Sequence, residues 1–351
     1  MTNNAAKSIG VGVVGLGFMG RTHLAAYAAA TRDGLPCEIV ALADMDRGRL
    51  AGASNASGGG NLETGAANVR LFDPAKVKAF NDPSSLFRDP DVDLVSICTH
   101  TDTHVDLALA ALRAGKHVLV EKPVALKSEE VRRLVEAAKA SGKLCMPAMC
   151  MRFWPGWTWL KDRVRDGSLG AIRSAAFQRL GAPPDWGQSF YRDPTRSGGS
   201  LFDLHIHDVD IIYWLMGMPT TVTSTGTAAH VTTLYRFENG PEHVAAEGGQ
   251  DHAPGFGFRM RFTVVFERAT AEFDLSRVEN PLLVYREGRT ETVAVPALGG
   301  YDAEVRHLME AIAANKPSKE LAATLEDALA VTTILEAERQ SLETGAPVRL
   351  E

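Results

Sequence analysis

Short β-branched runs alternate with amphipathic stretches between Ile9 and about Met149. The expected strands are Ile9–Val14, Cys37–Ala43, Val77–Phe80, Leu94–Cys98, His117–Val120 and Leu144–Met146. The expected helices between them are Met19–Ala30, Pro83–Phe87, Thr103–Ala114 and Ser128–Ala140. Strands that alternate with helices in this way predict an α/β domain with a doubly wound parallel sheet.

The pattern changes after about Met151, where strand-like segments follow one another behind a single helix-like segment, Trp157–Arg165. These strands are Ile172–Leu180, Thr220–Thr225, Thr232–Phe237, Phe258–Phe266, Thr270–Leu275, Leu282–Arg286 and Thr290–Val295. Strands without helices between them favour a largely antiparallel, open sheet. Two helices, Asp302–Ala314 and Thr324–Thr344, follow. We therefore expect one domain over residues 1–148 and a second, α+β domain over residues 149–351.

Composition and charge exclude several classes of protein. The chain has 351 residues, of which 45% are hydrophobic and 23% charged, as in an ordinary globular protein. Its net charge of −6 provides no positive field for a phosphate polymer, so nucleic-acid binding is not expected. The longest apolar runs, such as Ala25–Ala30, are much shorter than the ~20 residues that span a bilayer. Residues Met1–Ser8 are polar and precede no long apolar segment, which predicts a cytoplasmic protein without a secretory signal.

A glycine-rich motif follows the first expected strand directly and opens the first expected helix. It places Gly15, Gly17 and Gly20 around Leu16, Phe18 and Met19. In such a strand–turn–helix unit, the first glycine permits the tight turn and the second lets a pyrophosphate approach the backbone. The third lets the helix pack closely on the sheet. The position of this motif predicts a dinucleotide-binding domain of the Rossmann type.

Asp44 is the expected acidic partner of this motif, because it ends the second strand and lies 24 residues after Gly20. A carboxylate at this point accepts hydrogen bonds from the adenosine ribose and repels a 2′-phosphate, which favours NAD over NADP. Arg47 and Arg49 lie just beyond it and could instead hold a phosphate, so NADP stays the second choice.

Two further clusters carry candidate chemistry. Glu121, Lys122 and Pro123 follow the strand His117–Val120, at the carboxyl edge where open α/β sheets bind ligands. Asp203 and His207 are four residues apart on an expected helix, so they share a face and can address one small molecule. A purely structural Asp–His pair is the alternative, since buried polar groups are commonly paired. The four cysteines form no Cys-x-x-Cys pair, and neighbouring histidines diverge on a helix, so no metal site is expected.

The ordered motifs resemble those of one family, the GFO/IDH/MocA oxidoreductases, over nearly the whole chain. The motifs that carry the resemblance are Gly15 to Gly20, Ser96 to Thr99 with Thr101 to His104, Ala114 to Pro123, and Asp203 with His207. The resemblance implies an N-terminal Rossmann domain and a C-terminal domain for substrate binding and oligomerisation, with dimers or tetramers expected. Two positions depart from the common pattern: His100 stands where many members have proline, and His205 where many have glycine.

The resemblance also implies roles for particular residues. Lys122, Asp203 and His207 are expected to meet at the nicotinamide as the catalytic residues, with His207 as the base. Residues expected to contact the cofactor are Gly15, Gly17, Phe18, Met19, Gly20, Asp44, Thr99, His104, Glu121, Lys122 and Arg152. Residues that the resemblance leads us to expect at the substrate are Lys122, Arg152, Asp203 and His207. Trp186 and Tyr191 are further candidates, because aromatic faces suit a sugar ring, with packing or subunit contacts as the alternative. His205 adds bulk that we expect to change the shape of the substrate site.

The resulting hypothesis is an NAD-dependent dehydrogenase that oxidises a secondary hydroxyl of a sugar, sugar derivative or cyclitol. A neutral imidazole suits the proton transfer that accompanies hydride loss near pH 7. One alternative is an enzyme that cleaves or epimerises a glycoside through transient oxidation and retains its NAD. A second alternative is a non-catalytic dinucleotide-binding regulator, which would need no group for proton transfer.

Overall fold

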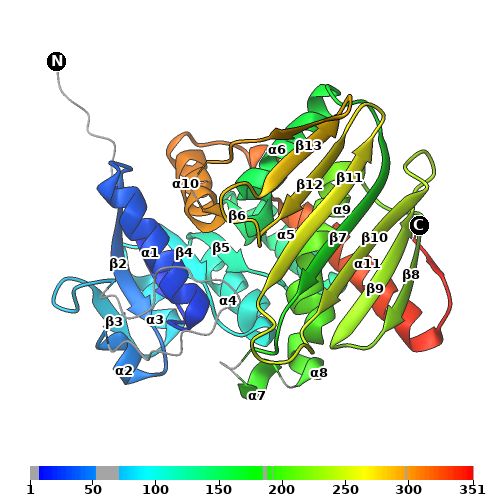
Figure 1. Cartoon of the computed structure of the whole chain (residues 1–351). Helices are drawn as coiled ribbons and strands as arrows, with labels where there is room; N and C mark the ends of the chain where they lie inside the picture. Colours follow the sequence, from blue (N-terminus) through cyan, green and yellow to red (C-terminus); the bar gives the residue numbers. More distant parts are fainter. Residues whose placement is uncertain (1–7, 53–70, 185–187, 192, 297–298, 351) are drawn as a thin grey trace. The chain divides into compact units, whose positions relative to one another are not determined.

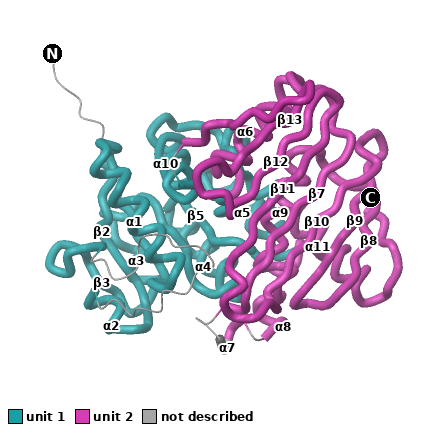
Figure 2. Tube along the Cα trace, in the orientation of Figure 1, with its two compact units in different colours: residues 1–125, 129–150, 299–328 teal, residues 126–128, 151–298, 329–351 magenta. Residues whose placement is uncertain are grey.

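The structure is a computed structural model that describes residues 8–52, 71–184, 188–191, 193–296 and 299–350. The chain divides into two compact units, coloured teal and magenta in Figure 2. Unit 1 contains residues 1–125, 129–150 and 299–328. Unit 2 contains residues 126–128, 151–298 and 329–351.

Unit 1 is built on a six-stranded parallel sheet with the order β3-β2-β1-β4-β5-β6 (Figure 1). Its strands are β1 (Ile9–Val14), β2 (Cys37–Ala43), β3 (Lys78–Phe80), β4 (Leu94–Ile97), β5 (His117–Glu121) and β6 (Cys145–Ala148). β1 and β4 are buried along their whole length, which explains their continuous apolar runs. The predicted Rossmann-type sheet is confirmed.

Helices flank this sheet in unit 1. They are α1 (Phe18–Arg32), α2 (Arg47–Leu50), α3 (Pro83–Arg88), α4 (Thr101–Arg113), α5 (Ser128–Ser141), α10 (Gly300–Ala313) and the short 3₁₀ helix η3 (Ser318–Glu320). α10 packs against α1 and buries Val305, Leu308 and Met309. The sequence expectation grouped α10 with the second domain. The apolar spacing of α10 predicts that one face of the helix is buried, but it does not predict which element covers that face.

Unit 2 is built on a nine-stranded sheet with the order β14-β13-β12-β11-β7-β10-β9-β8-β15 (Figure 1). Its strands are β7 (Ile172–Leu180), β8 (Thr221–Gly226), β9 (His230–Arg236), β10 (His243–Gly249), β11 (Arg259–Phe266), β12 (Thr270–Asp274), β13 (Leu282–Arg286), β14 (Arg289–Thr292) and β15 (Val348–Arg349). All neighbours are antiparallel except β10 and β7, which confirms a largely antiparallel sheet. β10 and β15 were not predicted from the sequence. β10 ends just before Gln250, which contacts Asp203.

One face of this sheet is buried, and the other stays open. Burial alternates residue by residue along β9, β10 and β11, as a half-covered sheet requires. The helical segments of unit 2 are η1 (Cys150–Phe153, whose first residue belongs to unit 1), α6 (Pro155–Asp166), α7 (Gln188–Tyr191), α8 (Pro194–Ser197), η2 (Leu201–His205) and α9 (Ile206–Met216). η2 contacts β9 and β10, and α9 contacts β7 and α6.

The last long helix, α11 (Leu325–Thr344), begins in unit 1 and continues in unit 2. Among the helices that the structure describes, none is both long enough and apolar enough to cross a membrane.

Candidate functional site

The turn between β1 and α1 is shaped by glycines at positions where a side chain does not fit. Gly15 has φ +86°, and a Cβ there would lie 2.6 Å from the carbonyl oxygen of Cys98. A Cβ on Gly20 would lie only 1.8 Å from the carbonyl oxygen of Gly15. Gly17 forms the N-cap of α1 without any side-chain cap. The amino end of α1 is therefore shaped to receive an anionic group such as a pyrophosphate.

The carboxylate of Asp44 is fixed beside this turn. Its Oδ2 accepts a hydrogen bond from the Leu16 amide at 2.6 Å, and its Oδ1 accepts one from the Asp46 amide at 2.8 Å. The guanidinium of Arg49 lies 3.6 Å from Oδ2, so this cation is already beside a carboxylate. The glycine turn and the oriented carboxylate together fit the pyrophosphate and ribose of a dinucleotide.

His104 joins the loops that follow β4 and β5. Its Nδ1 lies 2.9 Å from the carbonyl oxygen of Pro123, and its Nε2 lies 3.1 Å from that of Thr99. Burial lowers the pKa of His104, so the neutral ring donates to one of the two carbonyls at a time. These contacts are with the backbone, so they favour a role in holding the loops over a direct contact with the cofactor.

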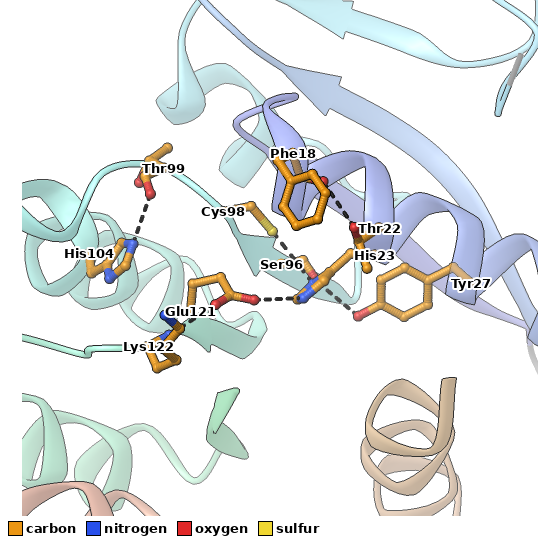
Figure 3. Close-up of polar contacts among 10 residues, drawn as sticks. All are labelled: Phe18, Thr22, His23, Tyr27, Ser96, Cys98, Thr99, His104, Glu121 and Lys122. Carbon is orange, nitrogen blue, oxygen red and sulfur yellow. Dashed lines mark hydrogen bonds and ion pairs between the residues drawn. The ribbon is translucent and has the colours of Figure 1, made fainter. Parts of the chain in front are cut away.

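A buried polar network supports the backbone just before Lys122 (Figure 3). Glu121 Oε1 lies 2.9 Å from His23 Nε2, and Glu121 Oε2 accepts a hydrogen bond from the Lys122 amide at 3.1 Å. His23 Nδ1 lies 3.3 Å from Ser96 Oγ, which lies 2.8 Å from the Tyr27 hydroxyl. The network links α1 to the carboxyl ends of β4 and β5. It therefore fixes the backbone at the start of the loop after β5, where the partly exposed Lys122 lies.

Cys98 lies beside this network but is a poor nucleophile. Its Sγ lies 3.5 Å from His23 Nδ1 (Figure 3). Burial, with a smaller contribution from Glu121, raises the pKa of the Cys98 thiol well above its ordinary value. The thiol therefore stays protonated, and we assign it no catalytic role.

In unit 2, Asp203 and His207 lie on the helical segment that starts after Gly198 and Gly199. η2 is a π-type turn, in which each hydrogen bond spans one more residue than in an α-helix, and it runs directly into α9. Every residue from 201 to 210 is buried except Asp203 and His207, which are partly exposed. The two predicted residues therefore share the one accessible side of this segment. The side-chain amide of Gln250 donates to Asp203 Oδ2 at 2.9 Å and orients the carboxylate.

The two carboxylates of α9 form buried ion pairs. Asp208 pairs with Arg179 at 2.9 Å, and Asp210 pairs with Arg152 at 2.7 Å, with all four side chains at most 2% exposed. The Arg152 guanidinium also lies 5.6 Å from the centre of the Trp214 ring. The role of Arg152 in ligand binding stays a prediction, and these contacts favour a structural role.

His205 is fully buried, and its Nε2 has two polar neighbours. Its Nε2 lies 3.0 Å from Glu338 Oε2 and 3.1 Å from the Tyr235 hydroxyl. The expected divergence of His205 from Asp203 and His207 agrees with this burial. The expectation that the bulk of His205 changes the shape of the substrate site does not agree with this burial, because the ring faces the interior of unit 2.

Comparison with known proteins assigns the chain to a family. Residues 9–149 match the family described as "Oxidoreductase family, NAD-binding Rossmann fold", and residues 157–278 match the "GFO/IDH/MocA C-terminal domain". The chain belongs to the GFO/IDH/MocA oxidoreductase family. This confirms the resemblance drawn from the sequence motifs, and it identifies the β1-to-β6 region of unit 1 as an NAD-binding Rossmann domain.

Similar family members include two inositol dehydrogenases. Inositol 2-dehydrogenase 2 of Saccharopolyspora erythraea is 30% identical over 221 residues, which are 62% of this chain and 56% of that protein. Myo-inositol 2-dehydrogenase of Thermotoga maritima is 36% identical over 142 residues, which are 40% of this chain and 41% of that protein. The matched regions thus span about half the length of these relatives. A levoglucosan dehydrogenase solved with NADH and levoglucosan shares the fold, with a TM-score of 0.82, 24% identity and coverage of 98% of this chain and 99% of that one.

Other predicted site residues of this GFO/IDH/MocA protein have different outcomes. Trp186 lies outside the described residues. Tyr191 is partly exposed at the end of α7, with its ring edge-on to Phe190 at 5.3 Å. Its role toward a substrate stays a prediction.

Sequence reasoning missed two residues that support the candidate groups. His23 lies 98 residues from its partner Glu121, and Gln250 lies 47 residues from its partner Asp203. His23 was hidden because it sits inside an apolar helix pattern. Gln250 was hidden because β10, the strand that precedes it, was not recognised.

Proposed function

We propose that this protein is an NAD-dependent dehydrogenase that oxidises a secondary hydroxyl of a sugar, sugar derivative or cyclitol. The observation that carries the proposal is the selective exposure of Asp203 and His207 within an otherwise buried segment of an oxidoreductase-family chain. A regulator would need no such pair. Residues placed only to stabilise the fold would be expected in the interior, as Asp208 and Asp210 are.

The cofactor is proposed to bind unit 1 through the glycine turn and Asp44. Gly15, Gly17 and Gly20 let the pyrophosphate approach the backbone, and Asp44 accepts hydrogen bonds from the adenosine ribose. The adjacent Met45 is 92% exposed, so it offers an apolar surface for the adenine ring. When bound, NAD⁺ supplies the acceptor for the hydride that leaves the substrate carbon.

The chain's own residues would manage the proton and the developing charge. His207 is proposed to take the hydroxyl proton, a role suited to imidazole near neutral pH. Asp203, oriented by Gln250, would align His207 or accept a hydrogen bond from the substrate. Lys122, whose backbone amide is held by Glu121, would stabilise the developing alkoxide. Each assignment is carried over from the family onto the matching position.

The names of the relatives support the substrate class. Relatives named for inositol and levoglucosan act on rings rich in hydroxyl groups. The test is to incubate the protein with NAD⁺ and a panel of cyclitols, anhydrosugars and monosaccharides, and to follow NADH absorbance. Substrate-dependent NADH formation is expected. Dinucleotide that stays bound without net NADH would instead indicate an enzyme that returns the hydride, and no response with no bound dinucleotide would overturn the proposal.

Replacing Asp44 by alanine is expected to reduce the preference for NAD⁺ over NADP⁺, because the carboxylate that repels a 2′-phosphate is lost and Arg49 stays nearby. The measurement is kcat/KM with each cofactor for the wild type and the variant. Replacing Asp46, which also lies near Arg49 but caps α2, provides the matched control. An unchanged cofactor ratio in D44A would refute the assignment of Asp44.

We further propose a homo-oligomer, a dimer or a tetramer, in the cytoplasm. The open face of the unit 2 sheet supports self-association, because it presents exposed apolar side chains such as Leu234 and Tyr285.

A further inference from the structure

A cluster of imidazoles and a carboxylate lies at one end of β9 and β10, next in the chain to Gln250, and none of its members is a candidate catalytic residue. It consists of His230, Asp251 and His252, whose potential ligand atoms all lie within 4.8 Å of one another. His230 Nδ1 lies 2.8 Å from Asp251 Oδ1, and His252 Nδ1 lies 3.5 Å from the same oxygen. The side chains are 30%, 49% and 20% exposed in that order, so solvent can reach the group.

The two rings are held in place by their surroundings. His230 stands opposite Gly249 in the β9–β10 ladder, and a Cβ on Gly249 would lie 2.7 Å from His230 Nδ1. Glycine at that position therefore makes room for the imidazole. The His252 ring stacks on Phe256 with ring centres 4.1 Å apart. Its Nδ1 is shielded from solvent and makes no hydrogen bond with the described residues, so in the tautomer with the proton on Nε2 it offers a lone pair toward Asp251.

The group around His230 also has the outer hydrogen bonds that are typical of metal-binding histidines. Glu247 Oε1 lies 3.0 Å from His230 Nε2, and Glu247 Oε2 accepts a hydrogen bond from Gln178 at 2.7 Å. A carboxylate on one ring nitrogen holds the proton there and leaves the other nitrogen to bind an ion. In His230 that other nitrogen is Nδ1, which faces Asp251 and His252.

We propose that His230, Asp251 and His252 form a binding site for a divalent transition-metal ion, with Zn²⁺ as the best-suited probe. Two imidazole nitrogens and one carboxylate oxygen are a donor set that zinc commonly takes, with water completing the coordination. Zinc bonds of about 2 Å place neighbouring ligand atoms roughly 3.4 Å apart. The two separations to Asp251 Oδ1 are 2.8 Å and 3.5 Å, and all three ligand atoms lie within 4.8 Å of one another. Asp251 is half exposed, so its side chain can shift to admit the ion.

The competing explanation is a proton in place of a metal. A doubly protonated His230 could bridge Glu247 and Asp251 without any ion. That arrangement leaves the shielded Nδ1 of His252 unused, whereas a metal ion uses all three residues. Since protons and metal ions compete for imidazole, the binding measurement belongs at mildly alkaline pH.

The test uses the full-length protein without a histidine tag, freed of metals by a chelator and titrated with Zn²⁺ in a calorimeter. One ion per chain is expected. The variants H230A, D251A and H252A should each weaken binding by at least about 10-fold. The outer variant E247Q should weaken it by about 10–100-fold while leaving one ion per chain. H243A is the matched control, because His243 is an exposed imidazole at the other end of β10, and its affinity should equal that of the wild type.

Far-UV circular dichroism of each variant separates lost ligands from lost folding, and D251A alters the most exposed member of the set. Cobalt(II) gives an independent reading, because its visible absorption reports nitrogen and oxygen ligation and should disappear in H252A. The proposal is overturned if the wild type binds no Zn²⁺. It is equally overturned if H230A and H252A both fold and bind Zn²⁺ as the wild type does, since the ion would then lie elsewhere.

Discussion

Replacing His207 by alanine is expected to lower turnover at least ~100-fold while leaving NAD binding intact. The side chain lies on the accessible side of a segment whose remaining members, Asp203 excepted, are buried, so its removal leaves no cavity in the core. A general base supplies its effect in the transition state, so kcat should fall and the dissociation constant of NAD should not change. The measurement is steady-state NADH formation, with NAD affinity determined separately by calorimetry.

Added imidazole provides a sharper reading of the same variant. If His207 is the base, free imidazole should restore part of the lost turnover in H207A and have no effect on the wild type. H243A, which removes an exposed histidine of β10, controls for the loss of an imidazole as such. Unchanged turnover in H207A would move the base elsewhere, and Lys122 would be the next residue to test.

Elements with a strong local pattern could be predicted from the sequence. β1, β2, β7 and β13 begin and end at the predicted residues. β1 is a continuous apolar run, whereas β7 mixes apolar and polar residues as a half-buried strand does. The glycine turn and Asp44 could be predicted because the spacing of the three glycines and of the acidic residue that ends the second strand is a recognisable motif.

Features that depend on distant contacts could not be predicted. β10 reads His-Val-Ala-Ala-Glu-Gly-Gly, and its glycines and alanines give little strand signal, although it pairs with β7 and β9. Without β10, nothing placed His230 near His252 or Gln250 near Asp203. Likewise, the expected absence of a metal site was argued from cysteine spacing and from one helix. His230 and His252 are 22 residues apart and share neither a cysteine motif nor a helix, so no local pattern marks them as a pair.

Arg152 is a further residue whose contact could not be predicted, because its partner is distant in sequence. The aromatic and basic segment around it resembled a loop that meets cofactor and substrate, and nothing local pointed to Asp210, 58 residues away. In the structure, Arg152 Nε lies 3.0 Å from both carboxylate oxygens of Asp210, and both side chains are 1% exposed. A structural role and a ligand-binding role make different predictions when this pair is altered.

Replacing Asp210 by alanine is expected to lower the free energy of unfolding by about 3–5 kcal/mol, because it leaves the Arg152 charge buried without its partner. The double variant R152M/D210L removes both charges, so it should recover most of this loss. Chemical denaturation of wild type, single and double variants measures the coupling. R165A is the control, since it breaks an exposed pair with Asp162 whose loss should cost about 0–1 kcal/mol.

The double variant also decides the role of Arg152, because it separates folding from ligand contact. If Arg152 is structural, R152M/D210L should bind NAD and turn over substrate nearly as the wild type does once it is folded. A well-folded double variant with a large loss of NAD affinity would show that the guanidinium reaches the cofactor. A raised KM with NAD affinity unchanged would point to the substrate instead, because only the interaction with the substrate would then have been lost.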